Sequence, residues 1–244
     1  MAILITGGSK GIGRAIAVRF AKPGNAVFVN YHADDSAAES TAEEIRSKGA
    51  EAHLIKGDVR TPEGARRVVE QVGERTDRLD QLVHGAVDPY ASAALEADLD
   101  AFTQAVHLNG LALLYLVQPA LKLLQRGSTV FFLSSRGSYL AVPNYVGIGP
   151  AKALAESLIK YLAVELAPRG IRANTVSAGA LPTDALRALL PDLDDRLPAM
   201  AAANPSGRNV DFDDVTALVE FLASPEAQMI QGRTVMVDGG LTLR

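Results

Sequence analysis

A tyrosine and a lysine that lie close together in the sequence are residue types that could act together on one substrate oxygen. Tyr145 stands seven residues before Lys152, Ser135 stands ten residues before Tyr145, and Ile148 occupies the position four before the lysine. A phenol titrates near pH ~10 in water, so a neighbouring ammonium would strengthen its power as a hydrogen-bond donor. A hydroxyl aimed at an oxygen that gains negative charge lowers the barrier as an oxyanion hole does. Tyr145 is the predicted donor, and Lys152 the predicted source of charge.

The spacing of seven residues has two structural interpretations. On one helix, residues seven apart share a face and are separated by about 10.5 Å along the axis, against about 6 Å for residues four apart. That wider gap suits a substrate whose reacting carbon is conjugated to the polarised oxygen and offset from it. Pro150, however, favours the first turn of a helix over its interior, which would place Tyr145 on the segment leading into the helix.

A glycine-rich turn lies near the start of the chain. The segment Thr6-Gly-Gly-Ser-Lys-Gly-Ile-Gly13 follows the first predicted strand and opens the first predicted helix. Glycines there permit a tight turn and the close approach of a pyrophosphate, whose charge is met by amides at the helix N-terminus. The placement between strand and helix predicts a dinucleotide site. Its expected contacts in this turn are Gly7, Ser9, Lys10, Gly11, Ile12 and Gly13.

The end of the second predicted strand bears on which dinucleotide binds. NAD-specific folds usually carry an acid there that grips the ribose 2′-hydroxyl, whereas this chain has Asn30, Tyr31 and His32. Lys10 could pair with a 2′-phosphate. His32 is a weaker partner for a phosphate than arginine, and two aspartates lie nearby. NADPH is therefore the predicted cofactor, with NADH the less favoured alternative.

Short β-branched runs alternate with helical patterns along the chain, which indicates a parallel sheet covered on both faces. We expect one α/β domain over residues 1–244, a doubly wound Rossmann fold with seven strands. The predicted strands are 3–6, 26–30, 51–56, 82–85, 129–133, 172–176 and 234–237. Predicted helices follow the glycine-rich turn and cover about 36–48, 63–76, 98–125, 150–167 and 212–223. Residues 179–205, rich in Ala, Leu, Pro and Asp, are the predicted substrate lid, although a plain loop with short helices is the alternative.

Composition excludes several classes of function. Net charge is −4 with a pI near 5.6, and no basic block is present, so nucleic acid is not an expected partner. There is no cysteine and only four scattered histidines, so we expect no metal site. The longest apolar run, 111–117, is far below the ~20 residues that cross a bilayer, and the first strand begins too early for a signal peptide. We expect a cytoplasmic protein with no membrane partner.

In their order and spacing, the motifs resemble those of the short-chain dehydrogenase/reductase family. The glycine-rich turn has the Thr-Gly-x-x-x-Gly-x-Gly form, and the Ser135, Tyr145 and Lys152 segment resembles that family's active site. The segments around Asn109 and Asp238-Gly-Gly240 also match. His84-Gly85-Ala86 matches the family's Asn-Asn-Ala segment only in part, and we interpret His84 as a structural histidine at a strand end.

This resemblance implies roles for further residues. Lys152 would hold the nicotinamide ribose, Ser135 would match the catalytic serine, and Asn109 would anchor a water through a kink in its helix. Tyr139 is a second hydroxyl that could contact the substrate beside Tyr145. The remaining implied cofactor contacts are Asp58 and Val59 at the adenine, Gly85 and Ala86 after the fourth strand, and Gly179, Leu181 and Thr183 over the nicotinamide.

The departure from the usual tyrosine position bears on the reaction. Most of the family has a tyrosine four residues before the lysine. The longer spacing in this chain and its Ala178-Gly179 pair are typical of the enoyl-thioester reductases within the family. The whole chain is similar to the FabL-type enoyl-acyl-carrier-protein reductases. The resemblance implies reduction of an enoyl thioester by NADPH, with the acyl group on coenzyme A or acyl carrier protein, in a homotetramer built on helices 98–125 and 150–167. A carbonyl reductase and a non-catalytic dinucleotide-binding protein are the alternatives.

Overall fold

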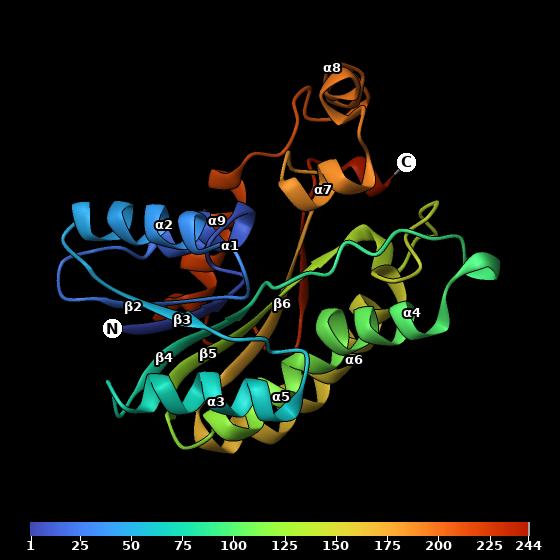
Figure 1. Cartoon of the computed structure of the whole chain (residues 1–244). Helices are drawn as coiled ribbons and strands as arrows, with labels where there is room; N and C mark the ends of the chain where they lie inside the picture. The colour runs from blue at the N-terminus through green and yellow to red at the C-terminus, as the bar shows by residue number, and fades with distance from the viewer. Residues whose placement is uncertain (244) are drawn as a thin grey trace.

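The computed structural model describes residues 1–243, which form one seven-stranded parallel sheet in the order β3-β2-β1-β4-β5-β6-β7 (Figure 1). The inner strands β1 and β6 are buried at every position, because helices cover both faces of the sheet. This confirms the expected doubly wound α/β fold. The strands are β1 (Ala2–Thr6), β2 (Ala26–Tyr31), β3 (Glu51–Lys56), β4 (Leu79–His84), β5 (Leu124–Ser135), β6 (Arg172–Ala178) and β7 (Thr234–Val237).

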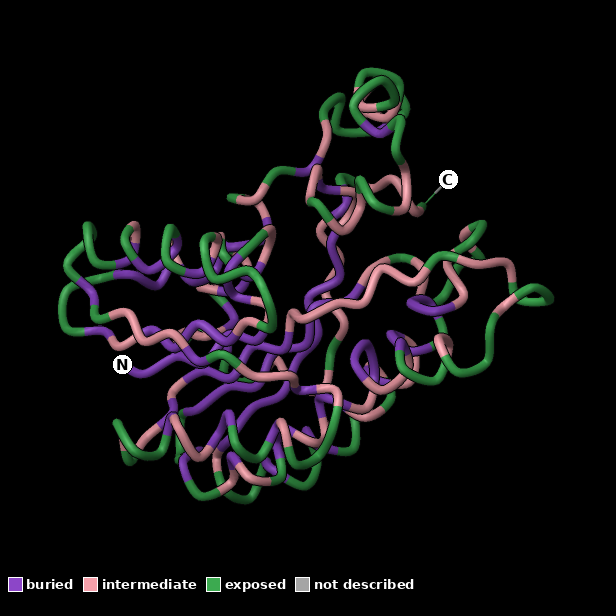
Figure 2. The backbone as a smooth tube through the Cα atoms, in the orientation of Figure 1, coloured by how far each residue is buried: buried purple, intermediate pink, exposed green. Residues whose placement is uncertain are grey.

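Two layers of helices enclose two apolar cores. Helices α1 (Gly11–Arg19), α2 (Asp35–Ser47) and α9 (Phe212–Ala223) cover one face, and α3 (Pro62–Gly73), α5 (Ala112–Ala120) and α6 (Gly149–Leu166) cover the other (Figure 1). Figure 2 shows the buried residues concentrated in the strands and on the inner sides of these helices. Short 3₁₀ turns cover Ala94–Glu96, Arg136–Ser138, Ala167–Arg169, Pro225–Ala227 and Leu241–Leu243.

The long helix expected over 98–125 is wrong. The structure has α4 (Leu99–Val106), a π-helical turn (His107–Leu111) and α5, and the chain has already entered β5 at residue 124. Gly110 explains the turn, because a Cβ there would lie 2.8 Å from the carbonyl oxygen of Ala151 in α6. The wider turn lets the two backbones meet, and such insertions are frequent at functional sites.

Two central strands extend further than their β-branched runs predict. β5 continues to Ser135 and β6 to Ala178, and these two residues are paired across the ladder. Strand order reverses between β1 and β4, the point at which open α/β sheets form a crevice beyond their carboxyl ends. The residues that follow β1, β4, β5 and β6 therefore converge at one end of the sheet.

Residues 179–205 form two short helices, α7 (Asp184–Leu189) and α8 (Leu193–Ala203), which stand beyond this end of the sheet (Figure 1). Most of their surface is exposed or half-buried (Figure 2). Within residues 1–243 no helix combines the length and the apolar character needed to cross a membrane.

Candidate active site

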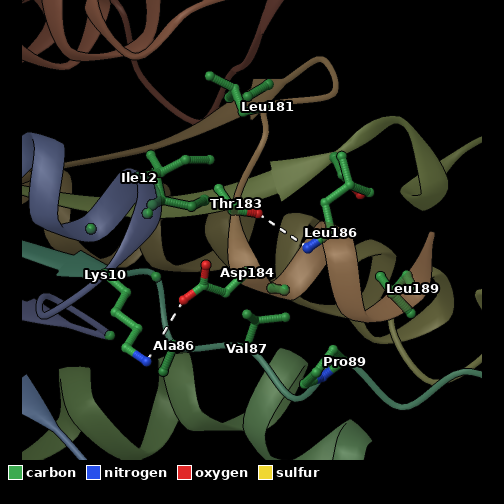
Figure 3. Close-up of a pocket in the computed structure, with 18 of the residues that line it drawn as sticks. Lys10, Ile12, Ala86, Val87, Pro89, Leu181, Thr183, Asp184, Leu186 and Leu189 are labelled. Atoms are coloured by element: carbon green, nitrogen blue, oxygen red, sulfur yellow. Dashed lines mark hydrogen bonds and ion pairs between the residues drawn. The ribbon is translucent and has the colours of Figure 1, made fainter. Parts of the chain in front are cut away.

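A cavity of about 920 Å³ lies at the carboxyl ends of the strands. The glycine-rich turn after β1, the turns after β3 and β4, the end of β5 and the segment after β6 form its walls, and α7 and α8 cover one side. Figure 3 shows side chains from α7 facing the loop that follows β4. All the predicted cofactor contacts line this cavity, as do Ser135, Tyr145 and Lys152.

Tyr145 reaches the cavity from a turn that precedes α6. The helix begins at Gly149 with Ile148 as its N-cap, and the Tyr145 carbonyl accepts hydrogen bonds from the amides of Ile148 (3.1 Å) and Gly149 (2.8 Å). Asn144 has a φ of 56°, a left-handed conformation that asparagine tolerates better than most residues. The same-face argument for a seven-residue spacing on one helix is therefore wrong. The turn, with Pro150 at the start of the helix, sets the position of the tyrosine.

The phenol of Tyr145 is held on two sides. Its hydroxyl lies 3.2 Å from Ser135 Oγ at the end of β5, and its ring packs over Gly137, where a Cβ would lie 2.5 Å from two ring carbons. Burial raises the pKa of Tyr145, and the Ser135 hydrogen bond and the Arg136 charge oppose that shift. Tyr145 is therefore a neutral phenol near pH 7, able to donate to a substrate oxygen.

Lys152 is buried in the first turn of α6. Its Nζ donates to the carbonyl of Leu133 (2.6 Å) and lies 4.8 Å from the centre of the Phe132 ring. Burial lowers the pKa of Lys152 to about 8, while the nearby carboxylate of Glu156 raises it. The positive charge that lowers the pKa of Tyr145 is that of Arg136.

Arg136 is a residue that the sequence analysis missed. It directly follows Ser135, lines the cavity, and is exposed at its wall. Among residues 1–243 its guanidinium has no ion-pair partner within 4 Å. Its position directly after Ser135 is the sequence feature that could have identified Arg136 as a site residue.

Asn109 lies on the π-helical turn and is fully buried behind the cavity. Its Oδ1 accepts from the amide of Asp88 (2.8 Å), and its Nδ2 donates to the carbonyls of Asp88 and Gly147 (both 3.0 Å). The side chain thus ties the loop after β4 to the loop that carries Tyr145. The helix kink is present as the resemblance implied, but the side chain does not line the cavity.

The glycine-rich turn has the shape that a pyrophosphate requires. Gly7 has a φ of 66°, and a Cβ there would lie 2.8 Å from the backbone of Ala86. A Cβ on Gly13 would collide with the carbonyl of Gly7, so the helix packs directly on the turn. Only glycine permits this approach, which leaves the amides at the start of α1 open to the cavity.

The residues at the end of β2 that line the cavity carry no carboxylate. Asn30 donates its amide to the carbonyls of Ile55 and Gly57 (both 3.0 Å), and the Tyr31 hydroxyl donates to Asp35 (2.8 Å). Asp34 and Asp35 do not line the cavity. His32 does line it, as does Lys10.

Lys10 joins the glycine-rich turn to two other elements. Its Nζ lies 2.5 Å from Asp34 and 3.7 Å from Asp184 at the start of α7 (Figure 3). The hydrogen bond with Asp34 raises the pKa of Lys10, which keeps it cationic at neutral pH. A 2′-phosphate would have to compete with Asp34 for this lysine.

The turn after β3 brings one predicted carboxylate and one unforeseen cation to the cavity. Asp58 lines the cavity, and its Oδ1 accepts from the amide of Arg60 (2.9 Å). Arg60 also lines the cavity and pairs with Asp88 at 3.5 Å. Arg60 could not be predicted from the sequence, because one arginine in a turn carries no motif.

Residues after β6 supply an apolar wall. Thr183 Oγ1 accepts from the amide of Leu186 (3.2 Å) and so caps α7 (Figure 3). Leu186, Leu189 and Met200 line the cavity on this side, and Val87 and Pro89 lie opposite. The wall suits a hydrocarbon chain better than a polar ligand.

His84 and Tyr139 are two further residues for which the sequence predicted a role. His84 is buried, its Nδ1 bonded to Thr6 Oγ1 (2.7 Å) and its Nε2 to the carbonyl of Leu108 (3.0 Å). Burial and the Lys152 charge lower its pKa to about 3, so it is neutral and structural, as interpreted. The expected contact between Tyr139 and substrate is not supported, because Tyr139 is 50% exposed and does not line the cavity.

Known proteins resemble this chain along nearly its whole length. Residues 7–242 match a family model described as enoyl-(acyl carrier protein) reductase. The chain is 32% identical to 1-cyclohexenylcarbonyl-CoA reductase of Streptomyces collinus, over 98% of this chain and 86% of that protein. It is 31% identical to 3-oxoacyl-acyl-carrier-protein reductase FabG of Staphylococcus epidermidis, over 98% and 97%.

Solved structures of related proteins also superpose on nearly the whole chain. An NADP active-site complex of RhlG from Pseudomonas aeruginosa superposes with a TM-score of 0.88 at 28% identity, over 98% of this chain and 95% of that one. A short-chain dehydrogenase from Burkholderia cenocepacia in complex with NADP superposes with a TM-score of 0.89 at 30% identity, over 99% and 97%.

Proposed function

This chain belongs to the short-chain dehydrogenase/reductase family and is an oxidoreductase, and from that premise we propose that it reduces the C=C bond of an enoyl thioester with hydride from NADPH. The observation that carries the proposal is the position of the Tyr145 hydroxyl relative to α6. Ile148, four residues before Lys152, is 1% exposed and does not line the cavity, while Tyr145 enters it from the preceding turn. The hydroxyl thus approaches from outside the helix that holds the lysine.

Such a hydroxyl suits conjugate reduction. Hydride adds to the β-carbon, the π electrons move toward the carbonyl, and negative charge develops on the thioester oxygen. Tyr145 donates a hydrogen bond to that oxygen and stabilises the enolate, and the α-carbon then takes a proton from solvent water. Because burial raises the pKa of Tyr145, donation without full proton transfer is the favoured role. Ser135 orients the phenol.

NADPH fits the residues that are present and would supply the hydride. The glycine-rich turn leaves room for a pyrophosphate, and the cavity near β2 lacks the carboxylate that would favour a ribose 2′-hydroxyl. Lys10 would pair with the 2′-phosphate and Lys152 would hold the nicotinamide ribose. The NADP complexes of the relatives from Pseudomonas aeruginosa and Burkholderia cenocepacia support this choice.

The apolar wall on α7 and α8 supports an acyl thioester as the substrate, with residues 179–205 acting as its lid. The acyl group would be carried by coenzyme A, as for the Streptomyces collinus relative, or by acyl carrier protein. A homotetramer would use exposed apolar side chains of α6, such as Tyr161 and Val164.

Carbonyl reduction of a 3-oxoacyl thioester is the second candidate. The 3.2 Å contact between Ser135 and Tyr145 would also serve a tyrosine that protonates an alkoxide, and the FabG relative is named for that reaction. The two candidates differ in which substrate bond accepts hydride.

Oxidation of NADPH with crotonyl and acetoacetyl thioesters, assayed side by side, tests the proposal. Turnover of the crotonyl thioester alone is the expected result. Turnover of the acetoacetyl thioester alone would support the second candidate instead. Tight NADPH binding without turnover of either compound or of a broad panel would leave a dinucleotide-binding protein.

A further inference from the structure

A group of polar side chains interrupts the apolar contact between α6 and the sheet. We call it the α6 polar cluster, and it consists of Ser134, Glu156, Thr175, Ser177 and Thr234. Ser134 Oγ donates to Glu156 Oε1 (2.5 Å), and Thr234 Oγ1 donates to Oε2 (3.3 Å). Both oxygens of one carboxylate are thus held by hydroxyls from β5 and β7.

Strand register places the other two hydroxyls beside these anchors. Ser177 is paired with Ser134 across β5 and β6, and Thr175 is paired with Thr234 across β6 and β7. Residues of the same parity in β5 and β6, Phe132 and Ala173, belong to the core under α6, so all four hydroxyls face that helix. Among residues 1–243, Thr175 Oγ1 and Ser177 Oγ are buried without a hydrogen-bond partner. Burying polar groups without hydrogen-bond partners costs free energy, so a functional reason for this cluster is expected.

Lys152 is the cationic group whose charge the Glu156 carboxylate would stabilise. It lies one turn before Glu156 in α6, is 5% exposed, and forms no ion pair within 4 Å among the described residues. A buried ammonium without a compensating charge is costly. Successive residues of β5 hold both side chains, since the Leu133 carbonyl binds Lys152 and the Ser134 hydroxyl binds Glu156.

We propose that Glu156 is a positioning residue for Lys152: anchored by Ser134 and Thr234, its carboxylate keeps the ammonium charged in the place where the Leu133 carbonyl holds it beside the cavity. The consequence for catalysis rests on the proposed function, because the charged lysine there holds the cofactor ribose. The effect on the lysine itself does not depend on the substrate.

The other titratable groups around Lys152 cannot replace Glu156. His84 on β4 is neutral, Tyr145 in the preceding turn is a neutral phenol, and Arg136 beyond β5 is a cation. Burial lowers the pKa of Lys152 to about 8, and Glu156 is the charge that opposes this shift. Removing the carboxylate should therefore lower the pKa further, so that the ammonium loses its proton at a lower pH.

The direct test is a pH titration of lysine side chains labelled with ¹³C at Cε, followed by NMR in the protein without added cofactor. The Lys152→Met variant identifies the Lys152 signal. In Glu156→Gln we expect the Lys152 midpoint to fall by about one unit, a tenfold change in its ionisation constant. The matched control is Glu165→Gln, an exposed carboxylate on the same helix, which should leave the midpoint unchanged.

Activity provides the second readout. In Glu156→Gln the high-pH limb of kcat/KM should move down with the NMR midpoint, while turnover near pH 6 stays close to wild type. An unchanged midpoint, or an equal loss of activity at every pH, would overturn the proposal. If Glu156→Gln does not fold, Ser134→Ala frees one carboxylate oxygen and should lower the midpoint by a smaller amount, and no change would overturn it equally. Absence of enoyl turnover in the wild type would refute the proposed function and leave the NMR test intact.

Discussion

Tyr145 has a fixed ring and a hydroxyl with a set direction. Its ring is fixed between Gly137 and the turn before α6, and its hydroxyl is directed into a cavity by Ser135. A rigid donor requires little reorganisation when charge develops on a bound oxygen, which is the condition for effective oxyanion stabilisation.

Replacing this hydroxyl gives the residue-scale prediction. Tyr145→Phe should lower kcat at least tenfold with little change in NADPH affinity, because it removes a contact made in the transition state. Steady-state kinetics and fluorescence titration with NADPH measure the two quantities. Tyr161→Phe, an exposed tyrosine on α6, is the control and should stay within about twofold of wild type. Near-normal turnover in Tyr145→Phe would remove the tyrosine from the mechanism.

Individual residues were predictable from the sequence where a motif fixes both residue type and spacing. One cavity is lined, as expected, by Gly7, Gly11 and Gly13 of the first turn and by Ser135, Tyr145 and Lys152. Arg136 and Arg60 were not foreseen, because a cation in a loop gains its meaning only from what the fold places beside it. Tyr139 was chosen for its proximity in sequence, and it does not line the cavity.

At the scale of elements, the site depends on close backbone approaches around the start of α6. Gly110 on the π-helical turn faces the carbonyl of Ala151, and Gly149 packs on Gly137, where a Cβ would lie 2.5 Å from the Gly137 carbonyl oxygen. These contacts fix the helix that carries Lys152 and the turn that carries Tyr145.

A single methyl group tests this arrangement. In Gly137→Ala the new Cβ would overlap the ring of Tyr145, so the phenol must move away from Ser135. We expect kcat to fall about tenfold or more, since small misplacements of catalytic groups are costly, while NADPH affinity changes little. Gly73→Ala in α3 is the control, because its Cβ would make only ordinary contacts of 3.7 Å or more. Wild-type kcat in Gly137→Ala would show that the tyrosine position is not critical.

Elements with strong periodicity were predicted well, and the exceptions have physical causes. β3, β7 and α9 match their expected ranges, whereas the helix over 98–125 is divided by the π-helical turn at Gly110. The π-helical turn is set by the contact of Gly110 with Ala151 of α6, 41 residues later in the sequence, and no local pattern reveals such a contact. The place of Tyr145 before α6 was one of two interpretations, and Pro150 favoured the correct one.

The whole molecule carries a stability cost for its site. Lys152 is buried with its pKa lowered from 10.5 to about 8, so below pH 8 the folded protein holds a charge that would be better solvated in the unfolded chain. Between pH 8 and 10.5 the unfolded chain binds more protons than the folded one, and this contribution to stability rises with pH. Functional sites commonly trade stability for activity in this way.

Lys152→Met should therefore raise the free energy of unfolding at pH 7, by about 1–3 kcal/mol after the loss of the Leu133 hydrogen bond. The increase in the free energy of unfolding should become smaller as the pH approaches 10, because Lys152 of the wild type is already neutral there. Urea unfolding at pH 7 and pH 9.5 measures the difference, with Lys160→Met, an exposed lysine on α6, as the control. A gain that is the same at both pH values, or no gain at pH 7, would contradict a buried charged lysine.

Conjugate reduction is the central claim, and the fate of the transferred hydride tests it most directly. Crotonyl and acetoacetyl thioesters are supplied together with NADPH deuterated at C4 of the nicotinamide, and the products are analysed by mass spectrometry and NMR. The account predicts butyryl thioester with deuterium at C3 and no labelled 3-hydroxybutyryl thioester. Deuterium in 3-hydroxybutyryl thioester, with crotonyl thioester recovered unchanged, would contradict it.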